Sequence, residues 1–84
     1  MLKTKVFYVI ELEGERFYRR NHESVGGVRP TNSIIKAMQY SDVNEAKERY
    51  AKLLQLHNED NKNPKPVNIL RFGLLNANII EENI

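Results

Sequence analysis

The chain contains no cysteine, and this absence limits both its chemistry and its location. Without thiols it forms no disulfides and offers neither thiolate nucleophiles nor thiolate metal ligands. Small secreted domains often depend on disulfides for stability, so 84 residues without cysteine are expected in a reducing cytoplasm.

Long hydrophobic runs are also missing. The apolar stretch near the N-terminus, Val6–Ile10, stops at Glu11. It is too short for the core of a signal peptide or for a membrane span. We therefore expect a cytoplasmic protein that makes no contact with a membrane.

The residue types that build catalytic and metal sites are sparse. The two histidines, His22 and His57, lie in unrelated contexts and provide no convergent ligand set. Three carboxylates lie close in sequence, but they flank an expected turn, where water keeps them ionised; they are Glu11, Glu13 and Glu15. Four hydroxyls have no base in an evident arrangement; they are Ser24, Thr31, Ser33 and Ser41. We predict no cofactor, no metal and no enzymatic activity.

A Gly26–Gly27 pair precedes Arg29 and Pro30, and glycine allows backbone amides to approach an anion. The stretch lacks the Lys-Ser/Thr of a phosphate-binding loop and does not lead from a strand into a helix. It is interpreted as a flexible loop from which Arg29 could reach an anionic partner. The first 36 residues carry seven Lys or Arg against four Glu, although the whole chain is only +2, which also favours an anionic partner.

The composition, with 40% hydrophobic and 29% charged residues, predicts one globular domain over residues 1–84. Residues 5–12 and 15–20 are rich in aromatic and β-branched types and are expected to form an antiparallel hairpin around Glu13-Gly14. A two-residue loop places three pairs of residues opposite each other: Glu11 with Arg16, Ile10 with Phe17, and Val9 with Tyr18.

The rest of the chain supplies one helix and two further strands. Residues 21–33 are expected to be a loop and Ile34–Tyr40 a third strand. Apolar residues recur at helical spacing after Asp42, which predicts a helix over residues 42–57 that Asp42 and Glu45 cap. After a Pro-containing connector, Val67–Leu75 is expected to be the last strand.

The tail, residues 76–84, is ambiguous, because its isoleucines could dock as a short helix or an edge strand, or could fray. The predicted fold is α+β, with an antiparallel sheet of about four strands in the order β-β-β-α-β and one amphipathic helix packed on one face. Because one helix covers one face, the other face is expected to be open.

The open face is the main candidate for function. In the predicted register it combines aromatic, apolar and basic side chains, with Arg19 and Arg29 at its rim; its other members are Phe7, Val9, Arg16, Tyr18 and Arg20. Tyrosine and arginine are enriched in protein-interface hot spots, whereas interleaved basic and aromatic residues also suit nucleic acid. A third alternative is that the C-terminal segment, or a second copy in a homodimer, covers this face as ordinary core.

Two stretches are familiar as supersecondary patterns. FYVIELEGERFYRR is a strand–turn–strand, and AMQYSDVNEAKERYAKL is a short strand that enters a capped helix. Together they resemble small uncharacterised proteins encoded by phages and prophages of Gram-positive bacteria. The resemblance covers the layout of residues 5–57 and implies an accessory binder that inhibits or redirects a host enzyme or defence complex.

The sequence therefore favours a non-catalytic protein-binding module whose partner is a host or phage protein. The alternative is a small DNA- or RNA-binding domain that uses Tyr18 together with the arginines, and a homodimer also remains open.

Overall fold

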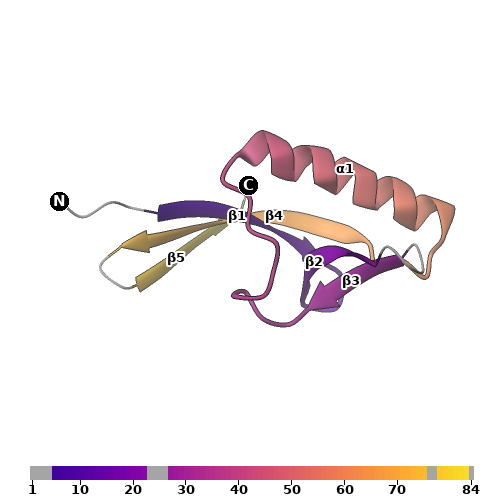
Figure 1. Ribbon diagram of the computed structural model, residues 1–84, viewed down its shortest axis with the longest axis horizontal. Helices are drawn as coiled ribbons and strands as arrows, with labels where there is room; N and C mark the ends of the chain where they lie inside the picture. Colours follow the sequence, from indigo (N-terminus) through magenta and orange to yellow (C-terminus); the bar gives the residue numbers. More distant parts are fainter. Residues whose placement is uncertain (1–4, 23–26, 76–77, 84) are drawn as a thin grey trace.

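A computed structural model describes residues 5–22, 27–75 and 78–83. Five antiparallel strands form one sheet in the order β3-β2-β1-β4-β5, and a single helix, α1, crosses one face of it (Figure 1). The elements are β1 (Lys5–Leu12), β2 (Arg16–His22), β3 (Gly27–Thr31), α1 (Val43–Glu59), β4 (Pro66–Leu75) and β5 (Asn78–Asn83). The predicted α+β fold is confirmed for β1 to β4 and α1.

The tail adds the strand that the sequence left open. β5 pairs with β4 from Leu75, opposite Asn78, to Leu70, opposite Asn83. An edge strand is therefore the outcome among the three alternatives for this segment. Ile84 lies outside the described residues.

Helix α1 begins directly after the predicted cap and ends at Glu59, two residues beyond the predicted end. Asp42 is the N-cap, and its Oδ1 accepts a hydrogen bond of 2.8 Å from the backbone N–H of Asn44. Ala46 and Leu53 lie seven residues apart on one stripe and are fully buried against the sheet. At the other end the Asp60 N–H donates to Leu56 O at 3.0 Å, and further helix is prevented by Pro64 in the connector and Pro66 at the start of β4.

The hairpin of β1 and β2 differs from the predicted register by one residue. Leu12 lies opposite Arg16, so the loop has three residues, of which Gly14 and Glu15 have φ of 79° and 57°. Glu13, the first loop residue, is bonded to the connector before β4: its N–H donates to Lys65 O at 2.9 Å and its Oε1 accepts from Lys65 N–H at 3.1 Å. Glu15, the last loop residue, has a left-handed conformation. A shift of one residue exchanges the faces of the β2 side chains.

The predicted third strand at Ile34–Tyr40 is wrong. The third strand is β3, which lies within the predicted 21–33 loop and carries Pro30, as an edge strand permits. Residues 32–40 instead form an irregular segment that begins with a turn, where Ser33 O accepts from the N–H groups of Lys36 and Ala37 at 3.2 and 3.0 Å.

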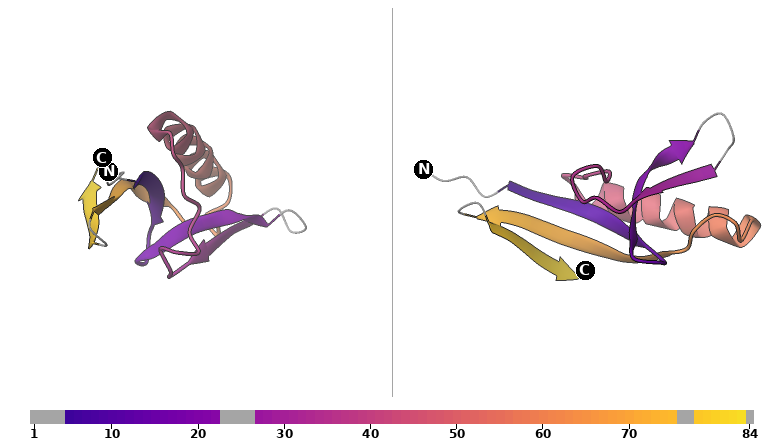
Figure 2. Two further views of the ribbon diagram at one scale, coloured as in Figure 1. Left: turned by 60° about the vertical axis from the view of Figure 1, so that its left-hand side comes forward. Right: turned by 90° about the horizontal axis from the view of Figure 1, so that it is seen from below.

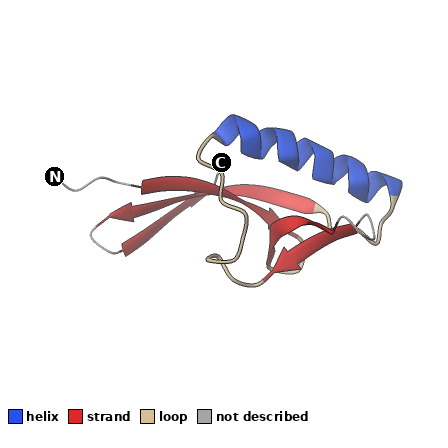
Figure 3. Cartoon of the chain, viewed as in Figure 1, coloured by secondary structure: helices blue, strands red, loops and turns tan. Residues whose placement is uncertain are grey.

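This segment ends in a gap between β1 and β2. The two strands pair only at the residues next to the loop and then diverge. Met38 N–H donates to Tyr18 O of β2 at 3.0 Å, and Tyr40 exchanges two backbone hydrogen bonds with Tyr8 of β1, at 2.7 and 2.9 Å. Segment 32–40 is thus hydrogen-bonded to both strands in the region where β1 and β2 are no longer paired with each other. Figure 3 shows it as a loop on the side of the sheet away from α1.

Apolar side chains form two clusters, one on each face of the sheet. Beneath α1 lie Ile10, Leu12, Tyr18, Tyr40, Ala46, Leu53 and Ile69. On the opposite face, Val9, Ala37, Leu70 and Phe72 pack with the partly buried Phe7, Phe17 and Ile34. Segment 32–40 therefore covers the face that the sequence leaves open, and the predicted open face is a wrong expectation.

The molecule is longer than a round domain of its size. Its principal extents are 46, 21 and 21 Å, and its radius of gyration is 13.3 Å, against about 12 Å expected for this length. Part of β1, the end of β4 and β5 extend beyond α1 at one end, and the β2–β3 hairpin twists away at the other (Figures 1 and 2). In the part of the chain that the structure describes, no helix is long and apolar enough to cross a membrane.

Candidate protein-binding surface

The structure separates the aromatic and apolar residues predicted to share an open face. Tyr18, which is 4% exposed, packs beneath α1, with the Arg49 guanidinium carbon 5.9 Å from the centre of its ring. Val9 is fully buried on the opposite face, beside Phe7, whose ring stacks on that of Phe72 with centroids 5.4 Å apart. The one-residue shift of β2 is the reason, and no single surface contains all three predicted residues.

Two of the predicted arginines lie away from that face as well. Arg16 is partly buried at the hairpin turn, where its Nε lies 3.5 Å from the position that a Cβ on Gly14 would occupy. Arg19 is partly buried at a register shift, because the pairing of β2 with β3 passes from Tyr18 directly to Arg20. The positions of both arginines are set by the local geometry of their hairpins, and the structure does not bring the two together in one site.

Arg20 and Arg29 are brought together by the pairing of β2 with β3. They lie directly opposite each other and both are exposed. Val28, next to Arg29, packs against the cluster beneath α1. Because successive side chains of a strand point to opposite faces, Arg29 and its partner Arg20 project from the face away from the helix.

Two exposed apolar side chains lie in segment 32–40, and the sequence analysis missed both. Ile35 is 87% exposed and Met38 is 46% exposed, whereas Ile34 and Ala37 of the same segment pack into the core. The turn at Ser33 therefore divides the segment into inward and outward side chains. Lys36, also exposed, lies between the two outward apolar residues.

We call these five residues the basic–apolar patch: Arg20, Arg29, Ile35, Lys36 and Met38. The hydrogen bond from Met38 N–H to Tyr18 O attaches segment 32–40 to β2. Arg20 lies two residues beyond Tyr18 on this strand, which corresponds to about 7 Å along the backbone. Strands β2 and β3 and segment 32–40 carry five arginines and lysines and no acidic residue. The patch thus combines two exposed apolar side chains with three exposed basic ones.

The sequence contains a signal for the exposed side chains of segment 32–40. Thr31, Asn32 and Ser33 follow Pro30 directly, and this composition is typical of a turn rather than of the entry to a strand. Apolar residues then recur three apart, as Ile34 with Ala37 and Ile35 with Met38, which is the spacing of a helical turn and not of a strand.

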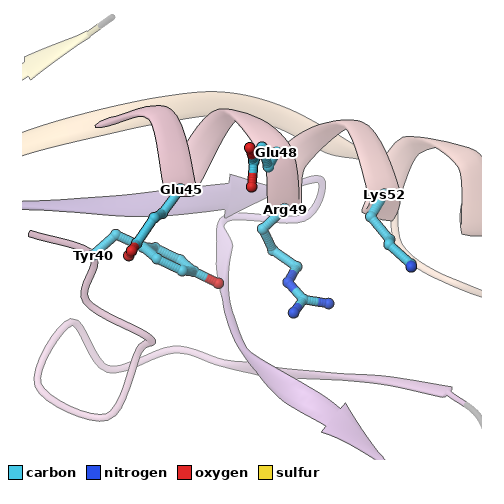
Figure 4. A pocket seen from close by; sticks show the side chains of 5 residues that line it. All are labelled: Tyr40, Glu45, Glu48, Arg49 and Lys52. Carbon is cyan, nitrogen blue, oxygen red and sulfur yellow. The ribbon is translucent and has the colours of Figure 1, made fainter. Parts of the chain in front are cut away.

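A hollow of about 330 Å³ lies where segment 32–40 meets the first half of α1. Its lining combines a tyrosine with two acidic and two basic side chains, as Figure 4 shows: Tyr40, Glu45, Glu48, Arg49 and Lys52. The guanidinium of Arg49 extends on the same side as the Tyr40 hydroxyl. Opposite charges alternate along this rim, so it has no net preference for an anion or a cation.

The hydroxyl of Tyr40 in this hollow has a raised pKa. Burial raises its pKa above the ordinary 10.0, and the neighbouring Tyr18 hydroxyl raises the pKa further, whereas Arg49 opposes both. The phenol therefore stays protonated at neutral pH and acts as a hydrogen-bonding group rather than as a base.

The second hollow, of about 380 Å³, lies between α1 and the start of β4. Tyr50 in its lining donates its hydroxyl proton to Pro66 O at 3.1 Å, which fixes the helix to the strand. Nearby, His57 Nδ1–H donates to Asn63 O at 2.7 Å, so this histidine holds the connector after α1. Among the described residues, no group of three or more His, Asp or Glu could hold a metal ion.

Comparison with known proteins adds no relative: no protein-family model, curated protein or solved structure matches this chain. The resemblance to phage and prophage proteins therefore stays a prediction.

Proposed function

We propose that this chain is a non-catalytic protein-binding module whose contact surface is the basic–apolar patch. The observation that carries the proposal is Ile35, which is 87% exposed on a turn that backbone hydrogen bonds hold in place. A scattered exposed apolar side chain is ordinary, but Met38 lies three residues away and also faces solvent. A backbone that is already ordered loses little conformational entropy on binding, which favours recognition by a folded partner.

The sequence resemblance supports a host protein as the partner. On this reading the module acts in the cytoplasm, and in the host cytoplasm if it is phage-encoded, where it inhibits or redirects an enzyme or a defence complex. The domain needs no cavity for this task. Its two buried clusters hold the sheet, and the patch lies outside both of them.

The test compares two baits in a Gram-positive bacterial lysate: the wild-type chain and the Ile35→Asp/Met38→Asp variant. Because both side chains are exposed, the variant keeps its fold, which circular dichroism checks. Val67→Asp is the matched control, since Val67 is 41% exposed on β4, away from the patch. We expect the wild type and the Val67→Asp control to retain a protein that the Ile35→Asp/Met38→Asp variant does not retain. The affinity of this protein for the double variant should be more than about tenfold lower than for the wild type. Equal retention by all three baits contradicts the proposal.

Nucleic acid is the second candidate, and the opposed pair of Arg20 and Arg29 favours it. Such binding weakens steeply with salt because phosphate counterions are released. A fluorescent oligonucleotide titrated at low and moderate salt tests it, and no binding even at low salt excludes it.

A homodimer through the same patch is distinguished by sedimentation at several protein concentrations. A monomer over that range is the expected result for a module with a different protein as its partner. Association that Ile35→Asp abolishes would instead assign the patch to a second copy of this chain.

A further inference from the structure

The opposed arginines of the β2–β3 hairpin repel each other, and no described residue of that hairpin carries a compensating negative charge. Directly opposite residues in an antiparallel pair have Cβ atoms about 5 Å apart, and like charges there are destabilising. Arg20 and Arg29 occupy such positions. Among the described residues neither is recorded with an ion pair or hydrogen bond of its side chain, and β2, β3 and segment 32–40 contain no acidic residue.

Acidic and basic residues are distributed differently on α1. On α1, acidic and basic residues are interleaved, and two of the three cations have an acid four residues before them, as Glu45 with Arg49 and Glu48 with Lys52. Among the described residues, the excess of positive charge therefore lies in β2, β3 and segment 32–40. An anionic group placed between Arg20 and Arg29 would remove the repulsion and would meet two planar guanidinium donors.

The neighbouring side chains indicate which kind of anion this is. Single-stranded nucleic acid is held by exposed aromatic rings on which bases stack. Here the nearest aromatic residues are in the core, because Tyr18 is 4% exposed and Phe17 packs into the cluster on the opposite face. The exposed apolar groups are the aliphatic Ile35 and Met38, which fit a protein pocket.

We propose that the partner presents carboxylates beside an apolar pocket, so that Arg20 and Arg29 bind Asp or Glu side chains while Ile35 and Met38 enter the pocket. This inference rests on the proposed protein-binding function and adds the chemistry of the partner surface. Exposed charge pairs contribute mainly to specificity and to the rate of association, and the apolar pair supplies the buried area.

The probe is a display library of random peptides selected on the wild-type chain at about 0.1 M salt. Selected peptides are then titrated against the Arg20→Glu/Arg29→Glu variant and against Lys47→Glu/Lys52→Glu. Both variants lower the net charge equally, and the two lysines are exposed on α1, away from the patch. Single-stranded and duplex oligonucleotides are titrated in parallel.

We expect the selected peptides to be enriched in Asp or Glu together with apolar residues. The arginine variant should bind them about tenfold more weakly, and the lysine variant should bind them as the wild type does. The difference should shrink at about 1 M salt, where the screening length falls to about 3 Å.

Three results overturn the inference: peptides without acidic enrichment, equal weakening by both charge variants, or oligonucleotides that bind more tightly than the peptides. Its failure is distinguishable from failure of the proposed function. If Ile35→Asp/Met38→Asp abolishes peptide binding while the arginine variant changes nothing, only the acidic partner is wrong. If the apolar variant also binds as the wild type does, the patch is not the contact surface.

Discussion

The two faces of the sheet are covered by different kinds of chain. One is covered by α1, a regular helix of 17 residues with three acidic and three basic side chains among its Asp, Glu, Lys and Arg residues. The other is covered by segment 32–40, which is irregular and carries a single charge, on Lys36. The helix buries one stripe and exposes polar residues. The segment buries Ile34 and Ala37 but leaves Ile35 and Met38 in solvent.

The difference shows where a small domain can place a binding surface. A helical period sorts apolar residues to the core and polar residues to water along its whole length. A short irregular segment has no such period, so it closes a core with two side chains and presents two others outward. Exposed residues on such a segment contribute little to stability and can therefore be chosen for a partner.

The largest expected effect is on stability, and it compares the two parts of the chain that cover the sheet, α1 and segment 32–40. Leu53→Ala removes a fully buried side chain of α1 and should lower the free energy of unfolding by about 2–5 kcal/mol. Ile34→Ala, which trims a partly buried residue of segment 32–40, should cost about 1 kcal/mol. Urea unfolding measures both. Equal losses would show that the two covers stabilise the sheet to the same extent.

A second prediction concerns local opening. The Met38 N–H is bonded to a strand by an isolated hydrogen bond, whereas the amides of α1 belong to a continuous helix. Hydrogen exchange at Met38 should be at least about tenfold faster than at Leu53, a difference of about 1.4 kcal/mol in opening free energy. Exchange measured by NMR at both amides tests this. Equal protection would mean that segment 32–40 opens only when the whole domain unfolds.

The third prediction addresses the start of the helical cover. Asp42→Ala removes the acceptor for the Asn44 N–H and should destabilise the protein by about 1 kcal/mol. Asp42→Asn retains an oxygen acceptor and serves as the control, with a loss of only a few tenths of a kcal/mol expected. Thermal unfolding of the three proteins gives the comparison, and equal midpoints for Asp42→Ala and the wild type would contradict it.

The smallest expected effect is a pH dependence of stability linked to Tyr40, which lies where segment 32–40 meets α1. Because burial raises the pKa of Tyr40 above 10.0 in the folded protein, the unfolded chain loses this proton first as the pH rises. The stability linked to Tyr40 is thus complete below pH 10 and falls as the pH increases from there to the folded pKa. Tyr40→Phe lacks this dependence. Urea unfolding of both proteins between about pH 8 and pH 11 should show the wild type losing more stability at the alkaline end.

The site was harder to predict than the fold because it depends on register. A sequence pattern locates a strand but does not fix which loop residues complete a turn. Here the loop is one residue longer than predicted, and its first residue, Glu13, forms two hydrogen bonds with the distant Lys65. That shift moves Tyr18 beneath α1 and leaves Arg20 and Arg29 as the predicted site residues that are exposed together.

The sequence by itself determined the elements whose signals are local. Asp42 and the spacing of Ala46 and Leu53 specify α1, and alternating apolar residues specify β1 and β4. Only the tertiary structure decided that β1 and β2 separate, that residues 38–40 occupy the gap, and that segment 32–40 covers the second face. These features depend on hydrogen bonds between residues far apart in the chain, such as Tyr8 with Tyr40, and no local pattern records such contacts.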